Sequence, residues 1–234
     1  MPRHAIGTNN APNINRSAAR AVCDALSRRM DGSSAPRRIL ELGCGEGYTA
    51  SLIAELLAAS ATPHEIVCAD IDPSFFKAGD IPHISFVWAD LNADFHPGLF
   101  DAVVATEVIE HLENPLHFLR HALSCVVPGG ILCVSSPNVA NAYSALKIFL
   151  TGIPSMFERN PKPFGHITPV SPFLMEMFLG IISRETGRKF RCVVSYNRNV
   201  LLTPFSWGGK RFHATLPGGN RMFGEIALYL VIAS

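Results

Sequence analysis

The chain has 234 residues, of which 48% are hydrophobic and 17% are charged, and its 20 basic and 19 acidic residues give a formal net charge of +1. A chain of this length and apolar content can form a core without cross-links, which excludes intrinsic disorder and small disulfide-stapled scaffolds. The length predicts one domain that spans residues 1–234.

The cysteines and the N-terminus bear on the cellular compartment. Six cysteines stand singly, without a Cys-x-x-Cys pair or zinc-finger spacing, so we expect reduced, buried thiols in an intracellular protein. They are Cys23, Cys44, Cys68, Cys125, Cys133 and Cys192. Residues 1–17 lack the apolar run of a signal peptide, and no segment approaches the roughly 20 apolar residues of a membrane-spanning helix. The sequence therefore predicts a cytoplasmic protein without a membrane span.

The near-zero net charge conceals an uneven distribution along the chain. Residues 1–38 contain 7 basic and 2 acidic groups, residues 39–137 contain 2 basic and 13 acidic groups, and residues 138–222 contain 11 basic and 3 acidic groups. The basic parts could gather an anionic substrate, or they could dock against the acidic part of the same fold. The sequence leaves both interpretations open.

Helix and strand patterns alternate through the first part of the chain. A helix is expected over residues 16–30, where apolar side chains recur at helical spacing. Buried strands are expected at residues 38–42, 65–70, 84–88, 100–106 and 131–135, with a helix after the first strand, another over residues 115–126, and a turn at residues 128–130. This alternation predicts an α/β fold with a mostly parallel sheet and helices on both faces.

Beyond Pro137 the pattern is less regular. Helices are expected over residues 139–150 and 173–186, and strands at residues 190–196 and 224–232 with a Gly- and Pro-rich loop between them, which brings the sheet to seven strands. Loops at the carboxyl ends of strands set specificity in open α/β sheets. Residues 138–172 directly follow the fifth strand and are therefore expected to form a cap over the substrate, with residues 173–234 completing the fold.

The clearest binding motif lies at residues 39–47, where an apolar strand leads into a glycine-rich turn with the sequence Ile-Leu-Glu-Leu-Gly-Cys-Gly-Glu-Gly. Glycines let a backbone approach a ligand closely. The spacing of Gly43, Gly45 and Gly47 differs from the Gly-x-Gly-x-x-Gly of dinucleotide-binding proteins, and no Gly-Lys-Ser/Thr of a triphosphate-binding loop is present. The carboxylate of Glu41 would repel a pyrophosphate but suits a ligand with an ammonium and a sulfonium group.

This motif resembles the Glu/Asp-x-Gly-x-Gly-x-Gly of the class I, Rossmann-like S-adenosylmethionine-dependent methyltransferases. Three further motifs of that family follow in order: Asp70 after the second strand, Asp90 after the third, and the Phe-Asp-x-Val to Glu-His-Leu segment at residues 100–112. The resemblance covers residues 39–137. It implies a doubly wound sheet, S-adenosylmethionine as the cofactor, and methyl transfer as the activity.

The resemblance also implies a role for each matching residue. The glycine-rich turn would admit the methionine end of the cofactor. Asp70 would accept both ribose hydroxyls, since two carboxylate oxygens match a vicinal diol; Asp72 is the alternative acid, or the cap of the next helix. Asp90 would accept the exocyclic amine of adenine, while Ile71 and Leu91 would sandwich the ring.

Residues 107–111 read Glu-Val-Ile-Glu-His and offer chemistry beyond cofactor binding. On a helical turn, Glu107 would face the same point as Glu110 and His111. Three interpretations stay open. In the first, His111 is a general base for a substrate hydroxyl, with Glu107 in the same catalytic set. In the second, Glu107, Glu110, His111 and His166 bind a divalent metal. In the third, His111 and Glu110 only pin the turn.

The metal-binding interpretation resembles the small-RNA 3′-terminal 2′-O-methyltransferases, in which two Glu and two His bind a metal that holds the terminal ribose hydroxyls. Some quinone-pathway O-methyltransferases share the Glu-x-x-Glu-His part. Here His166 lies in Phe-Gly-His-Ile-Thr-Pro at residues 164–169, and the second nearby His and the Glu-Trp-Thr of the RNA enzymes are absent.

We therefore expect an S-adenosylmethionine-dependent methyltransferase that acts on oxygen, because His111 suits a hydroxyl and no Asn-Pro-Pro-Tyr motif of amino methylases follows the fourth strand. The expected acceptor is a small molecule, a lipid or a glycan, including anionic ones. The alternatives are a metal-dependent RNA ribose 2′-O-methyltransferase and an inactive, cofactor-binding interaction module. No DNA partner is expected.

The expected cap mixes aromatic and basic side chains, which could stack bases and hold phosphates or cover an apolar or anionic acceptor. Its members are Tyr143, Lys147, Phe149, Met156, Phe157, Arg159, Lys162 and Phe164.

Overall fold

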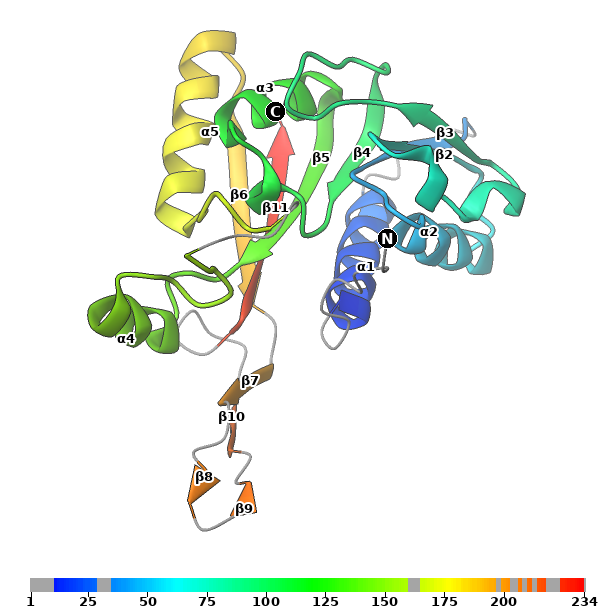
Figure 1. Cartoon of the computed structure of the whole chain (residues 1–234). Coiled ribbons are helices and arrows are strands. Elements are labelled where there is room, and N and C mark those ends of the chain that lie inside the picture. The colour runs from blue at the N-terminus through cyan, green and yellow to red at the C-terminus, as the bar shows by residue number, and fades with distance from the viewer. Residues whose placement is uncertain are drawn as a thin grey trace.

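A seven-stranded sheet forms the centre of the molecule (Figure 1). The computed structural model describes residues 11–28, 35–159, 165–196, 199–202, 206–207, 210–211, 214–217 and 224–233. The strand order is β3-β2-β1-β4-β5-β11-β6, and β11 runs antiparallel to both of its neighbours. The strands are β1 (Arg37–Leu42), β2 (His64–Asp70), β3 (Ile84–Trp88), β4 (Phe100–Ala105), β5 (Val126–Pro137), β6 (Phe190–Tyr196) and β11 (Ile226–Ala233). The predicted mostly parallel, seven-stranded sheet is confirmed.

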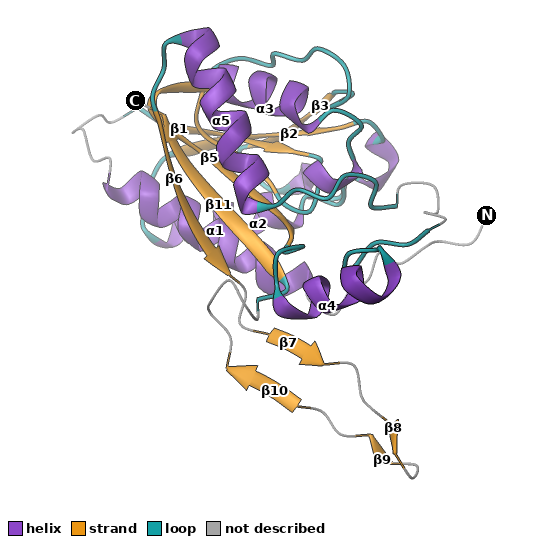
Figure 2. Ribbon diagram, turned by 90° about the vertical axis from the view of Figure 1, so that its left-hand side faces the viewer, coloured by secondary structure: helices purple, strands orange, loops and turns teal. Residues whose placement is uncertain are grey.

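Helices cover both faces of the sheet (Figures 1 and 2). One face carries α1 (Ala11–Arg28) and α2 (Tyr48–Ala59), and the other carries α3 (Pro115–Ser124) and α5 (Pro172–Thr186). Neighbouring strand residues alternate between the two cores: Ile39 packs with α1 and α2, whereas Leu40 packs with α3 and α5. Because both faces are buried, the strands are continuous apolar runs, which is why sequence periodicity identified them.

The helix expected over residues 16–30 is α1, which begins earlier, at Ala11, and ends at Arg28. Two other expected elements differ from the prediction in their local form. The helix expected from residue 139 begins later, as α4 (Ala142–Thr151), because the Asn141 side chain caps it by accepting the Ser144 N–H at 2.7 Å. The turn expected at residues 128–130 is a bulge inside β5, where the pairing with β4 passes from Val126 directly to Ile131. Both differences arise from local hydrogen bonding, and they leave the strand order unchanged.

The prediction that a loop alone joins the last two strands of the main sheet was wrong. Short antiparallel ribbons occupy part of it: β7 (Asn199–Leu202) pairs with β10 (Ala214–Pro217), and β8 (Ser206–Trp207) pairs with β9 (Lys210–Arg211). They extend away from the end of the main sheet (Figure 2). Gly208 and Gly209 are the two residues between β8 and β9, and this spacing is a hairpin signal. The strands are too short for their alternation to stand out.

Three 3-10 turns lie near the carboxyl edge of the parallel strands: η1 (Pro73–Phe75), η2 (Ala78–Asp80) and η3 (Ile109–His111). The Asp72 carboxylate accepts the Ser74 N–H at 2.9 Å, so Asp72 caps η1, as one of its two predicted roles required.

The cysteines, the charges and the helices bear on the remaining sequence predictions. All six cysteines are free thiols, and four of them are buried. Arg37 lies 3.8 Å from Asp101, and its neighbour Arg38 donates its backbone N–H to the same carboxylate, so the last two basic residues of the N-terminal segment contact the acidic part of the fold. In the part of the chain that the structure describes, no helix is long and apolar enough to span a membrane.

Candidate active site

The glycine-rich turn after β1 lies at the carboxyl edge of the sheet. Gly43, Gly45 and Gly47 adopt positive φ values of 65°, 50° and 80°. A Cβ atom on Gly43 would lie 2.5 Å from Cγ2 of Val108, whereas a Cβ atom on Gly45 would meet no atom within 4 Å. Gly45 therefore faces open space where a ligand can approach the backbone, which is what a cofactor at this turn requires.

Glu41 lies inside the protein, with an exposed fraction of 2%. Its Oε2 accepts the Ala50 N–H at 2.9 Å and lies 3.8 Å from the Cys68 thiol, which donates to it. Burial raises the pKa of Glu41 to about 7, against the opposing effect of these hydrogen bonds. The described contacts of Glu41 thus anchor the first turn of α2 to β1. The contact with the cofactor that was expected of Glu41 stays a prediction.

Asp70 ends β2, and Asp90 lies two residues after the end of the adjacent strand β3. Asp70 accepts the Gly45 N–H at 2.8 Å with one oxygen and the Asp72 N–H at 3.1 Å with the other. Asp90 accepts the Asn92 N–H at 2.9 Å. The structure therefore brings Gly45 and Asp70 into contact and places Asp90 just after the next strand.

The two apolar residues expected to sandwich adenine differ in exposure. Ile71 is 51% exposed, whereas Leu91 is 7% exposed. Ile71 thus offers a free apolar surface next to Asp70, while Leu91 is part of the core under α3.

Glu107 lies two residues after the end of β4 and adopts a positive φ of 56°. Its backbone N–H donates to Oγ of Ser135 at 2.9 Å, and the Ser135 hydroxyl donates to the Glu107 carboxylate at 2.8 Å. Burial raises the pKa of Glu107 to about 7, although the hydrogen bond from Ser135 opposes the shift. No sequence signal pointed to Ser135, which lies in the buried apolar run of β5.

Glu110 is fully buried in η3, and neither oxygen of its carboxylate has a hydrogen-bond partner. Its backbone carbonyl accepts the N–H groups of Ile167 and Thr168 at 2.9 and 3.0 Å, which pins the segment after residue 164 to η3. Burial, and then the neighbouring charge of Glu107, raise the pKa of Glu110 well above its ordinary value. An unpartnered buried carboxylate is costly, so a cation or a proton is needed there.

Three of the four expected metal ligands come together. One potential ligand atom each of Glu110, His111 and His166 lies within 4.8 Å of the others, and Nε2 of His166 is 4.0 Å from Oε1 of Glu110. Glu107 is not a member of this group, because its carboxylate is held by Ser135. The helical turn assumed for residues 107–111 is limited to η3, and Glu107 precedes it in the left-handed conformation.

The two histidines of this group lie edge to face, with ring centroids 4.8 Å apart. Nδ1 of His111 is 3.2 Å from the Gly165 carbonyl. Because a carbonyl only accepts, Nδ1 carries the hydrogen, and Nε2 of the neutral ring keeps its lone pair. Burial and then the neighbouring His111 lower the pKa of His166, which favours the neutral ring of His166. Neutral imidazoles can act as metal ligands or as bases.

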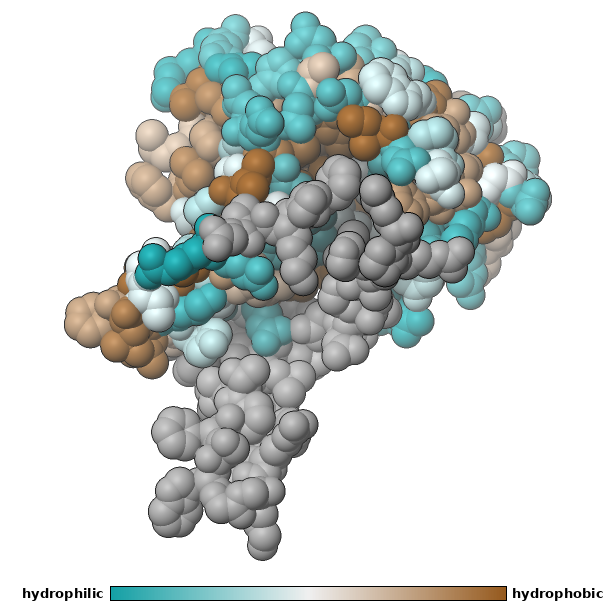
Figure 3. Space-filling view, viewed as in Figure 1, coloured by the Kyte–Doolittle hydropathy of each residue, from teal (hydrophilic) through white to brown (hydrophobic). Residues whose placement is uncertain are grey.

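The expected cap follows β5 as α4 and an irregular segment. Its described cations bond within the cap: Nζ of Lys147 donates to the carbonyls of Pro154 and Phe157 at 2.9 and 3.2 Å, and Arg159 donates to the Thr151 carbonyl at 3.0 Å. Large apolar side chains of α4 are exposed and form the brown surface at the lower left of Figure 3. They are Leu146, Ile148, Phe149 and Leu150. Lys162 and Phe164 lie outside the described residues.

Comparison with known proteins identifies the family. Residues 14–175 match the family model described as a methyltransferase domain. The chain is 32% identical over 119 residues to a ubiquinone biosynthesis O-methyltransferase of Xanthomonas campestris pv. campestris, which covers 47% of each chain. It is 30% identical over 143 residues to norajmaline N-methyltransferase of Rauvolfia serpentina, which covers 56% of this chain and 48% of that enzyme. The chain spans about half the length of these relatives.

Solved structures share the fold. Magnesium protoporphyrin IX methyltransferase from Synechocystis PCC 6803 with bound SAH has a TM-score of 0.59 at 15% identity, covering 100% of this chain and 90% of that one. A SAM-dependent methyltransferase from Archaeoglobus fulgidus has a TM-score of 0.53 at 18% identity, covering 92% and 94%. The family match spans the glycine-rich turn, both strand-end acids and η3. The chain belongs to the methyltransferase-domain family and has the class I fold that S-adenosylmethionine-dependent methyltransferases share.

Proposed function

We propose that this chain transfers a methyl group to a hydroxyl oxygen of a small acceptor with an apolar body, and that His111 removes the hydroxyl proton. The observation that carries the proposal is the lone pair of Nε2, which His111 keeps because Nδ1 donates to Gly165. The family alone leaves the acceptor atom open, since the relatives include both an O- and an N-methyltransferase.

The chain's own contribution to cofactor binding is positioning. S-adenosylmethionine supplies a methyl group that its sulfonium has already activated, so little covalent chemistry falls to the protein. Gly45 leaves space for the cofactor, and Asp70 keeps lone pairs for a ribose diol after accepting two backbone N–H groups. Asp90 offers its carboxylate to the adenine amine, with the exposed face of Ile71 beside it.

Proton removal is the step in which His111 acts. An alcohol or phenol must lose its proton as its oxygen attacks, and a neutral imidazole suits that task near neutrality. The Gly165 carbonyl fixes the ring orientation, and the two hydrogen bonds from Ile167 and Thr168 to Glu110 fix the segment that carries Gly165. A positioned base of this kind contributes about 100- to 10,000-fold to a rate.

A divalent cation held by Glu110, His111 and His166 is the second candidate for activating the hydroxyl. The observation that favours it is the unpartnered, fully buried carboxylate of Glu110 beside two imidazoles. One carboxylate and two imidazoles suit Mn²⁺, Fe²⁺ or Zn²⁺. A bound cation lowers the pKa of an oxygen that it coordinates. His111 would then be a ligand, and Glu110 would carry its negative charge without a proton.

The acceptor is proposed to be apolar because of the cap. The exposed apolar side chains of α4 lie just after the carboxyl end of β5, whereas Lys147 and Arg159 already bond to carbonyls within the cap. An RNA acceptor would need free cations for its phosphates. The described part of the cap therefore favours a lipid-like body over a nucleic acid.

The test begins with protein stripped of metal by a chelator. Binding of S-adenosylhomocysteine is measured by calorimetry, and methyl transfer is measured with an alkyl-substituted catechol and with a short single-stranded RNA, each with and without Mn²⁺. His111→Ala and Glu110→Gln are compared with His64→Gln, a histidine that also faces a carbonyl, that of Thr62 at 2.9 Å.

The proposal predicts transfer to the catechol without added metal and its loss in His111→Ala, with S-adenosylhomocysteine binding intact. If methyl transfer depends on Mn²⁺ and is lost in Glu110→Gln, the hydroxyl is activated by a metal ion and not by His111 as a base. Methylation of RNA alone would overturn the choice of acceptor. Full activity of His111→Ala would remove His111 from the reaction.

A further inference from the structure

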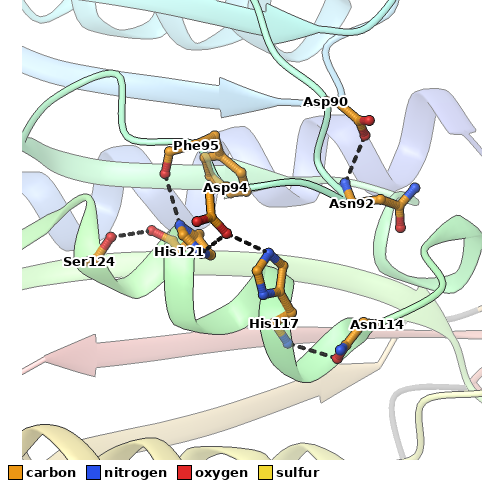
Figure 4. Close-up of polar contacts among 8 residues, drawn as sticks. All are labelled: Asp90, Asn92, Asp94, Phe95, Asn114, His117, His121 and Ser124. Atoms are coloured by element: carbon orange, nitrogen blue, oxygen red, sulfur yellow. Dashed lines mark hydrogen bonds and ion pairs between the residues drawn. The ribbon is translucent and has the colours of Figure 1, made fainter.

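A second group of potential metal ligands lies outside the candidate active site, between α3 and the segment that joins β3 to β4 (Figure 4). His117 and His121 are four residues apart on α3, so their side chains project from the same face of the helix. Both rings point at one carboxylate: Oδ1 of Asp94 is 3.3 Å from Nε2 of His117 and 3.1 Å from Nε2 of His121. This group shares no residue with the Glu110 group.

The hydrogen bonding of His121 indicates that a cation belongs between the three ligand atoms of this group. Nδ1 of His121 lies 3.1 Å from the Phe95 carbonyl, which can only accept, so Nδ1 carries the hydrogen of the neutral ring. Its Nε2 lone pair then faces a carboxylate oxygen, which is a repulsive arrangement. Nε2 of His117 is buried and makes no hydrogen bond, although it points at the same oxygen. A positive charge is needed where the three atoms converge.

The distances match those between the ligand atoms of one metal ion. Zinc bonds of about 2.0–2.1 Å in a tetrahedral site put neighbouring ligand atoms about 3.3 Å apart, close to the two observed separations. A proton on Nε2 of His121 is the alternative, and it would place a charged ring beside that of His117, with the ring centroids 4.5 Å apart. One divalent ion satisfies all three ligand atoms at once.

The surroundings also suit a metal site. The bond from Nδ1 of His121 to a backbone carbonyl is the arrangement that orients most metal-binding histidines. The ring of Phe95 packs 5.3 Å from the His121 ring and limits its rotation. Asp94 is 85% exposed, so an ion can enter from solvent and keep water as a fourth ligand.

We propose that Asp94, His117 and His121 bind a transition-metal ion of the Zn²⁺ class, which fastens the segment after β3 to α3. That segment begins with Asp90 and is already tied to the region before α3, because Asn92 accepts the Glu113 N–H at 2.9 Å. The ion would add a second, stronger tie. Its role is structural, and it requires no metal in the active site.

The experiment titrates Zn²⁺ and, as a spectroscopic probe, Co²⁺ into the chelator-treated full chain. The variants are Asp94→Asn and His121→Gln, and the matched control is His64→Gln, whose ring faces a carbonyl but belongs to no ligand group among the described residues. Each is also measured in a Glu110→Gln background, so that ions bound by the Glu110 group are counted separately.

Each of the two variants should bind one Zn²⁺ ion per chain fewer with high affinity than its parent does, in both backgrounds. The affinity of this site for Zn²⁺ should fall at least ~100-fold. In the Glu110→Gln background, Zn²⁺ should raise the Tm of the parent and of His64→Gln but not of Asp94→Asn, which changes an exposed side chain and leaves the core intact. Equal stoichiometry and affinity in the wild type and both variants would overturn the proposal, as would an equal loss in His64→Gln.

Discussion

Gly43 and Gly45 lie two residues apart in the same turn, and replacing each with alanine separates stability from cofactor binding. In Gly43→Ala the new methyl group must accept a φ of 65° and lies 2.5 Å from Cγ2 of Val108. The positive φ costs about 1–2 kcal/mol, and overpacking against a buried side chain costs about 1–3 kcal/mol more. The expected loss in free energy of unfolding is therefore about 2–5 kcal/mol.

Gly45→Ala is the matched control, because its φ is 50° but its methyl group would meet no atom within 4 Å. Only the backbone cost of about 1–2 kcal/mol is expected for stability. The same methyl group would fill the space proposed for the cofactor, so binding of S-adenosylhomocysteine should weaken by about tenfold or more, or about 1.4 kcal/mol. Urea unfolding and calorimetric titration measure the two effects independently.

Removing the obstructing side chain supplies a further check. Val108→Ala in the Gly43→Ala background should recover part of the lost stability, since the contact with Val108 is then gone. Equal stability losses in Gly43→Ala and Gly45→Ala would refute the reasoning from packing. Unchanged binding of S-adenosylhomocysteine in Gly45→Ala would mean that the cofactor does not use this space.

Three other changes test separate parts of the fold and site. Asp70→Ala should abolish S-adenosylhomocysteine binding, whereas His111→Ala should leave it intact and slow methyl transfer at least ~100-fold; equal binding losses in a calorimetric comparison would contradict the assigned roles. Phe118→Ala removes a fully buried ring under the sheet and should cost about 3–5 kcal/mol in urea unfolding, a loss that an exposed ring would not produce. Burial raises the pKa of Glu41 in the fold to about 7, from an ordinary 4.5, so its contribution to stability is full below pH 4.5 and is lost as the pH rises through 7. Glu41→Gln should remove the loss in free energy of unfolding between pH 5 and pH 8. If the free energy of unfolding of the variant falls with pH as steeply as that of the wild type, the loss belongs to another group.

The sheet was predictable because its signals are local. β3 and β6, the two edge strands, have the predicted bounds because runs of β-branched and aromatic residues favour strands even where the faces are only partly buried. The ribbons formed by β7 to β10 were missed because strands of two to four residues carry too little alternation. The start of α4 depended on Asn141, whose capping bond overrides the apolar pattern that precedes it.

The candidate site was predictable only in its linear parts. The glycine-rich turn, Asp70 and Asp90 follow successive strands, so parallel topology brings them to one edge. The left-handed backbone of Glu107 and its bond to Ser135 depend on a contact between β4 and β5 that no spacing reveals. The separation of Glu107 from the Glu110 group follows from that contact.

The uneven charge is now interpretable for the described residues. Arg37 pairs with Asp101, and Lys147 and Arg159 bond to carbonyls within the cap. Arg188 donates to the carbonyls of Leu123 and Val126 at the end of α3 and the start of β5, where a helix C-terminus favours a cation. These cations stabilise contacts within one fold, so they are not available to an anionic acceptor. Among the described residues, these cations give no reason to expect a nucleic acid, and the exposed apolar face of α4 is the stronger guide to the acceptor.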